Sequence, residues 1–204
     1  MELYDTEEQQ VEAIKDWWKE NGKAVIFGAV VGLGGLFGWR YYQDSVIAAQ
    51  EAASESYTQA VQQLAEQGAS AESGVQTFIE ANKETEYATL AALQLAKVQV
   101  EAGNLDEAVA QLEWAKSSTQ DTALAAVINY RLARVKAEQG EFDSAIAQLA
   151  NIDDQSWAGR VAELKGDILL RKGDEQGAYA AYTESQQSGD ASQTLQLKLD
   201  DLAK

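Results

Sequence analysis

One stretch of the chain, from Leu132 to Leu149, reads LARVKAEQGEFDSAIAQL, and a similar one from Leu95 to Leu112 reads LAKVQVEAGNLDEAVAQL. A third segment, from Lys165 to Tyr182, aligns with both without gaps. Each segment has apolar residues at helical spacing on either side of a central glycine, where a left-handed C-cap causes no side-chain clash. The repeats therefore predict three helical hairpins that turn at Gly103, Gly140 and Gly173.

Equivalent positions of the three segments carry residues of similar size. Small residues, which let helices approach closely, stand at Ala96, Ala133, Gly166, Ala108, Ala145 and Ala178. Larger apolar residues, which fill the space between helices, stand at Val98, Val135, Ile168, Leu112, Leu149 and Tyr182. We therefore expect the hairpins to stack on one another.

This pattern resembles the tetratricopeptide repeat, which has a small residue in its first helix and a Gly-polar-aromatic-Asp-x-Ala turn. The best match is the segment from Gly140 to Ala145, GEFDSA. The turn glycines are 37 and then 33 residues apart, and the usual Trp and closing Pro are missing. The repeats are therefore divergent members of this pattern.

The flanking segments extend the same architecture. Helical patterns over Gln43–Gln67 and near Ala71–Ala81 predict a degenerate first hairpin, and Ser192–Leu202 predicts a closing helix through Leu195, Leu197, Leu199 and Leu202. No linker rich in Gly, Ser or Pro interrupts residues 43–204. We predict one α-solenoid domain over that range.

Composition supports an all-α fold and excludes several functions. The 204 residues include no Pro, and residues 43–204 hold 12 Lys and Arg against 26 Asp and Glu, a surface that repels nucleic acid. The chain has no His and no Cys, which removes the commonest general base, the thiol nucleophile and the usual zinc ligands. We expect no catalytic residues, no metal site, no cofactor and no enzymatic activity.

The 16 residues from Ala24 to Trp39 carry no charge. Trp39 at the end of this run, and Tyr41 and Tyr42 after it, are suited to the headgroup level, so residues 24–42 predict one N-terminal transmembrane helix. Two alternatives are a buried helix of a soluble domain, disfavoured by five glycines, and a cleaved signal peptide, disfavoured by the bulky residues at its end.

Positive residues predict the orientation of this span. Lys15, Lys19 and Lys23 precede it, whereas Arg40 alone follows it closely. By the positive-inside rule, residues 1–23 stay in the cytoplasm and residues 43–204 are translocated.

The segments at and before the span suggest further contacts. Gly28 and Gly32 are one turn apart, as are Gly34 and Gly38, and each pair would allow another helix to pack closely, although glycine-rich spans also occur without a dedicated partner. Residues 1–23 suggest an amphipathic helix that lies on the membrane, binds a partner, or simply extends the span.

The concave face of a solenoid is its usual binding surface. In the tetratricopeptide arrangement, the first helices of successive units would line it with Leu90, Leu93, Lys97, Val100, Val127, Tyr130, Arg134 and Ala137. Apolar residues with two cations suit an extended peptide or unfolded chain, but they equally suit an intramolecular helix.

Three stretches resemble the YfgM family, the ancillary subunits of the SecYEG translocon in the inner membrane of Gram-negative bacteria. They are EQQVEAIK from Glu8 to Lys15 with ENGK from Glu20 to Lys23, GWRYY ending at Tyr42, and AVINYRLARV from Ala126 to Val135. The resemblance implies a single-span protein with a periplasmic domain and no enzymatic activity. It also implies association with the translocon and with a membrane-anchored periplasmic chaperone of the peptidyl-prolyl isomerase type.

Two functions follow as hypotheses. In the first, the protein is a chaperone-like scaffold of the translocon that binds partner proteins, and exported polypeptides with them, and helps to pass those chains to periplasmic folding factors. In the second, it is a membrane-bound adaptor whose cytoplasmic segment binds a stress-response regulator.

Overall fold

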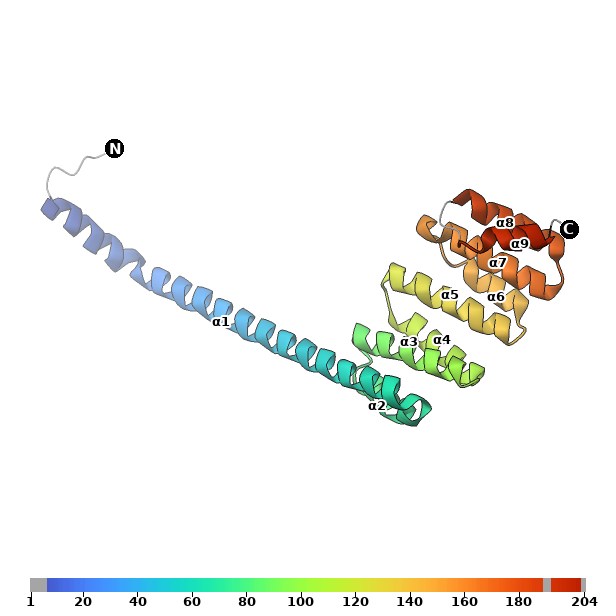
Figure 1. The fold of residues 1–204 in the computed structure, drawn as a ribbon. Helices are drawn as coiled ribbons and strands as arrows, with labels where there is room; N and C mark the ends of the chain where they lie inside the picture. The colour runs from blue at the N-terminus through green and yellow to red at the C-terminus, as the bar shows by residue number, and fades with distance from the viewer. Residues whose placement is uncertain (1–6, 189–191, 203–204) are drawn as a thin grey trace. The chain divides into compact units, whose positions relative to one another are not determined.

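The computed structural model of the chain describes residues 7–188 and 192–202, and every element in these ranges is a helix. The residues divide into two compact units, one up to Ala52 and one from Ala53 onward. In chain order the helices are α1 (Glu7–Gln67), η1 (Gly68–Ala71), α2 (Glu72–Ala81), α3 (Glu86–Glu101), α4 (Leu105–Ser118), α5 (Thr122–Glu138), α6 (Phe142–Leu149), η2 (Gln155–Trp157), α7 (Ala158–Lys172), α8 (Glu175–Ser188) and α9 (Leu195–Leu202) (Figure 1).

The first unit contains most of α1, and the predicted span lies inside this helix. Residues 9–67 form one uninterrupted helix, so no break separates the predicted amphipathic segment, the span and the helix from Gln43 onward. Residues 1–6 of the predicted cytoplasmic segment lie outside the described residues. By length and composition this helix can cross a membrane, and its most apolar window is almost entirely exposed, unlike the core helix of a soluble protein.

The turns of the three repeats have the predicted geometry. Gly103, Gly140 and Gly173 have φ values of 82°, 80° and 90°, in the left-handed region that glycine favours. At the first of these turns, the amide of Asn104 donates to the carbonyl of Gln99 and that of Gly103 to the carbonyl of Val100. Paired bonds of this kind satisfy the last helical carbonyls and reverse the chain.

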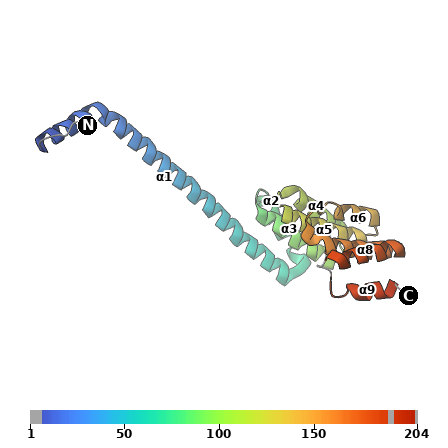
Figure 2. The same cartoon turned by 90° about the horizontal axis from the view of Figure 1, so that it is seen from above.

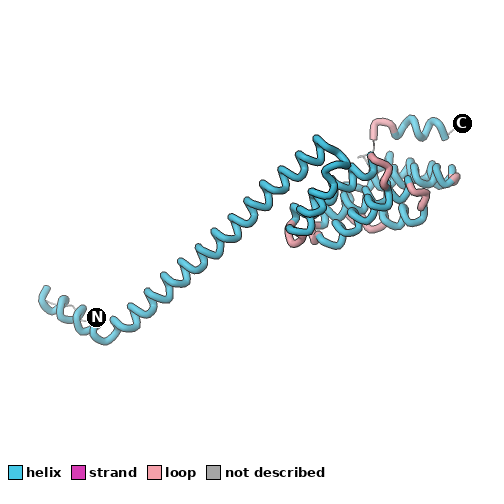
Figure 3. Tube along the Cα trace, turned by 90° about the horizontal axis from the view of Figure 1, so that it is seen from below, coloured by secondary structure: helices cyan, strands magenta, loops and turns pink. Residues whose placement is uncertain are grey.

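Each glycine turn joins two helices of one hairpin: α3 with α4, α5 with α6, and α7 with α8. Successive hairpins then stack in chain order, through α4 on α5 and α6 on α7 (Figure 1), and Figure 3 shows the described chain as helices joined by loops. The predicted small residues lie at these contacts, and Ala108, Ala133, Ala145 and Ala178 are completely buried. The prediction of stacked hairpins is confirmed.

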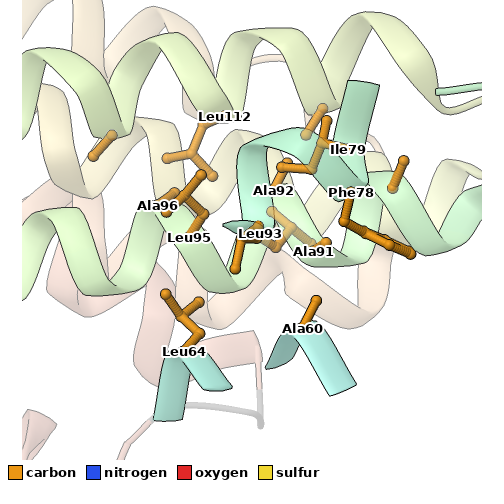
Figure 4. Packing of buried hydrophobic residues seen from close by; sticks show 14 of the residues in the cluster. Ala60, Leu64, Phe78, Ile79, Ala91, Ala92, Leu93, Leu95, Ala96 and Leu112 are labelled. Carbon is orange, nitrogen blue, oxygen red and sulfur yellow. The ribbon is translucent and has the colours of Figure 1, made fainter. Parts of the chain in front are cut away.

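The first hairpin is formed by residues 53–67 of α1 with α2. Ala60 and Leu64 of α1 face the alanines and leucines of α3, next to Phe78 and Ile79 of α2 (Figure 4). The centroid of the Tyr57 ring lies 6.3 Å from that of the Phe78 ring, so aromatic side chains pack between α1 and α2. Packing in this unit begins at Ala53; Val46, predicted to belong to the hairpin, is exposed.

The closing helix is α9, as predicted, and it packs on α8 through Leu195 and Leu199. Leu197 was expected among the packed leucines, but its side chain is 66% exposed. Leu195, Leu199 and Leu202 follow the helical spacing of four and three residues, whereas Leu197 falls on the opposite side.

A polar network ties α9 and the preceding turn to α7. The Nζ atom of Lys198 lies 2.9 Å from Oε1 of Glu163 and 2.7 Å from Oδ1 of Asp167. The amide and hydroxyl of Ser192 donate to the Glu163 carboxylate at 3.0 and 2.6 Å, and the hydroxyl of Tyr182 donates to Asp167 at 2.7 Å. These partners of the buried Glu163 are all donors, as a carboxylate requires.

We predict that Gly166→Ala destabilises the domain, because a Cβ atom there would lie 2.4 Å from Cδ1 and Cε1 of the Tyr182 ring. Overpacking of this kind costs about 1–3 kcal/mol. Urea unfolding of the detergent-solubilised chain, followed by circular dichroism, measures the change. Gly74→Ala is the matched control, since only the tip of Gln63 lies near its Cβ position. Equal stability of the two variants would contradict the close packing of α7 and α8.

We also predict that the C-terminal hairpin loses stability in acid through Glu163. Burial raises the pKa of this carboxyl, but hydrogen bonds from Lys198 and Ser192, together with the charge of Lys198, outweigh burial and lower the pKa overall. A lowered pKa stabilises the fold at neutral pH, and this contribution is lost as pH falls through the carboxyl range.

The test is urea unfolding of the wild type and of Glu163→Gln at neutral and at acidic pH. The variant should be less stable at neutral pH and should lose less stability on acidification. Parallel pH dependence of the two proteins would show that Glu163 is not responsible.

Candidate functional site

A groove of about 430 Å³ lies between α3 and α5, the first helices of two successive hairpins. One wall is formed by α3 and the other by α5, and Leu112 of α4 contributes to the floor. The groove lies entirely within the second unit of the chain. It is the strongest candidate for a binding surface in the part of the domain that the structure describes.

The floor of the groove is apolar. Leu93, Ala96, Leu112 and Val135 are each no more than 5% exposed, and they belong to the packed core beneath. Val100 is half-buried at the end of α3. Because the core fixes these side chains, the floor offers a preformed apolar strip to a ligand.

The rim of the groove is charged, and its carboxylates already have cationic partners. Glu138 pairs with Arg171 of α7 at 2.8 Å, and Glu101 lies 3.7 Å from Nζ of Lys97. Arg131 donates to the backbone carbonyl of Leu93 at 3.3 Å, across the groove.

The exposed side chain of Arg134 has no hydrogen bond or ion pair with any residue that the structure describes. With the carboxylates paired, the rim presents an available guanidinium, which makes the groove a cationic site in a strongly acidic domain.

A second hollow of about 420 Å³ lies on the other side of α3, against the end of α1 and η1. Lys97 and Glu101 line both hollows, and Leu64 and Val98 line the second. One turn of α3 therefore lies between the groove and the second hollow, and Lys97 and Glu101 on that turn are accessible from both.

The structure brings together four of the predicted site residues: Leu93, Lys97, Val100 and Arg134 line the groove. The remaining four lie elsewhere. Leu90 packs against the first core cluster, Val127 is half-buried outside the groove, Ala137 is buried in the second cluster, and the Tyr130 ring lies 5.4 Å from that of Trp157.

The environment of Tyr130 is that of a packed residue. Burial is the main reason that its pKa is raised; the charge of Arg134 opposes this shift, and Glu163 and Asp167 reinforce it. Tyr130 therefore belongs to the contact between the second and third hairpins.

Sequence reasoning missed Arg131, Val135 and Glu138 on α5. The prediction chose equivalent repeat positions on α3 and α5. A groove between these two helices is lined instead by the side of α3 that faces α5 and by the side of α5 that faces α3, and these sides do not carry equivalent positions. On α5 the lining residues are therefore shifted by one position, and with Arg134 they recur at the i, i+3, i+4, i+7 spacing of one helical face. That spacing was the available signal.

Other features of the described residues bear on function. No group of three or more carboxylates is arranged among them to hold a metal ion. In the first unit, a Cβ atom added to Gly28, Gly32, Gly34 or Gly38 would meet no atom within 4 Å, apart from its own helix backbone and chain neighbours. The glycine faces are therefore open to an approaching helix.

Comparison with known proteins identifies the family. Residues 15–204 match the family model described as a tetratricopeptide repeat-like domain. The chain is 39% identical over 206 residues to an ancillary SecYEG translocon subunit of Escherichia coli (strain K12), covering all of both chains. It is 35% identical over 198 residues to the protein of that name from Haemophilus influenzae, covering 96% of this chain and 97% of the relative.

Among solved structures, the chain is similar to Pseudomonas aeruginosa pilF, with a TM-score of 0.59 and 17% identity over 75% of this chain and 68% of that one. This likeness concerns the fold alone. The Escherichia coli and Haemophilus influenzae relatives span 96% or more of this chain, including both the long apolar helix and the repeats. The chain belongs to the family of ancillary SecYEG translocon subunits with a tetratricopeptide repeat-like domain.

Proposed function

We propose that this protein is a membrane-anchored, non-enzymatic scaffold of the Sec translocon, which binds partner proteins through its repeat domain. The observation that carries the proposal is the groove between α3 and α5, with an apolar floor and a cationic rim. Repeat solenoids bind their partners on extended concave surfaces, and this groove lies between the first helices of two successive hairpins. The names of the full-length relatives support association with SecYEG.

The proposed topology follows from the anchor. Residues 24–42 cross the inner membrane, residues 1–23 lie in the cytoplasm and residues 43–204 lie in the periplasm, in agreement with Lys15, Lys19 and Lys23 before the span. This orientation places the groove on the side where exported chains emerge.

The ligand of the groove is an extended polypeptide segment with apolar and acidic side chains. Leu93, Ala96 and Val100 of α3 offer apolar contact, while Arg134 offers charge to a carboxylate. Such segments occur in exported chains before they fold. A membrane-anchored periplasmic chaperone of the peptidyl-prolyl isomerase type is the proposed partner that receives them.

We predict that Arg134→Glu weakens the binding of an extended acidic peptide by about two- to fivefold, because an exposed ion pair contributes roughly 0.5–1 kcal/mol. Fluorescence anisotropy with a labelled peptide of alternating Leu and Glu measures the dissociation constant. The same peptide with Lys in place of Glu should bind the variant better than the wild type.

The matched control is Lys83→Glu, which reverses an exposed charge in the turn before α3 and away from the groove. Equal weakening by the two substitutions would contradict the groove and indicate a general effect of net charge.

We predict that the glycine faces of the span contact the translocon. Replacing Gly28 and Gly32 by Leu fills space that holds no atom of this chain, so the helix itself should be unaffected, while an approaching helix would be displaced. Copurification of SecYEG from mild detergent should fall severalfold. Ile26→Leu with Val30→Leu, on the opposite side of the span, is the control, and unchanged copurification with both pairs would exclude these glycines.

A further inference from the structure

The part of α1 before the span has an exposed apolar face. Val11, Ile14, Trp17 and Trp18 are between 50% and 67% exposed, although large apolar side chains are normally covered. Successive helical residues rotate by about 100°, so Val11, Ile14 and Trp18 fall on one narrow arc with Trp17 at its edge. Two indole rings on such an arc are the kind of side chain that gathers at a membrane interface.

The opposite arc of the same segment is charged. It holds Glu12, Lys15, Asp16, Lys19 and Glu20, and Nζ of Lys19 lies 2.8 Å from Oδ1 of Asp16. Three lysines and three carboxylates between Gln9 and Lys23 leave this segment without net charge. Attraction to anionic lipids therefore adds little, and the apolar arc must provide the binding energy for a surface.

The covalent structure determines which surface is within reach. Lys23 is followed directly by the apolar run from Ala24, so the amphipathic segment begins where the span leaves the bilayer. A helix in that place either projects into water with its apolar arc bare or turns into the headgroup layer.

A glycine and a polar side chain lie at the junction between this segment and the span. Gly22 has room for the Trp18 ring, whose atoms lie 3.1 to 3.3 Å from the position that a Cβ would take. The side chain of Asn21 donates to the carbonyl of Trp17 at 3.0 Å, which supplies a partner when helical bonds open. Bends in helices commonly occur at glycine, and α1 bends in its blue N-terminal part (Figure 2).

We propose that residues 9–21 form an interfacial helix that lies in the headgroup layer of the membrane crossed by Ala24–Tyr42, with Val11, Ile14, Trp17 and Trp18 inserted into lipid. The contact is with lipid and not with a protein partner. It rests on the proposed membrane span and is independent of the direction in which the span is inserted.

The absence of cysteine from the chain makes the test direct, because any single introduced cysteine carries a unique spin label. Full-length Ile14→Cys and Asp16→Cys proteins are labelled and reconstituted into phosphatidylcholine vesicles. Collision rates with oxygen, which concentrates in lipid, and with a nickel chelate, which stays in water, report the depth of each label.

We expect a severalfold higher oxygen-to-nickel ratio at position 14 than at position 16, unchanged between low and high salt. Replacing Trp17 and Trp18 by Ala should abolish the difference, whereas Glu20→Gln should not. Nickel access at both positions would overturn the proposal, as would exclusion of both reagents from position 14, which indicates a protein contact. A spin label at position 33 distinguishes failure of the interfacial helix from failure of the proposed span. If that label is not in lipid, residues 24–42 do not cross the membrane.

Discussion

The repeat domain depends on close contact between helix faces that carry alanine or glycine. No single helix of 8 to 17 residues can bury its own apolar side, so each needs a neighbour within a few ångströms of its backbone. Ala133, Ala145 and Ala178 are small enough to allow this close approach. Gly166 has no side chain at all, so the Tyr182 ring packs directly against the backbone of α7. The groove, the glycine turns and the closing helix are positioned by this stacking.

The same packing explains why the floor of the groove is both apolar and fixed. Leu93, Leu112 and Val135 are core residues whose outer edges form the floor, so a ligand meets side chains that the domain already holds in place. The charges around the floor depend on ion pairs with other helices. Arg171 of the next hairpin neutralises Glu138, so the rim is more cationic than its own residues suggest.

Patterns that depend on one helix were predictable from the sequence. Gly103, Gly140 and Gly173 marked the turns, because a left-handed residue is a local requirement. The contribution of Arg131 to the groove was not, since it depends on which side of α5 faces α3. Leu197 was placed in the core by composition, although its helical phase excludes it. The network of Glu163 with Lys198 joins residues too distant in sequence for any local pattern to indicate.

Helices of the domain contact mainly their neighbours in the chain, and this has a consequence for how the protein is made. A fold with local contacts needs no distant segment in order to begin, so it forms quickly. The chain has no proline and no cysteine, hence no prolyl isomerisation and no disulfide formation to delay it. The domain can therefore begin to fold once two successive hairpins are available to stack, before the rest of the chain has been synthesised.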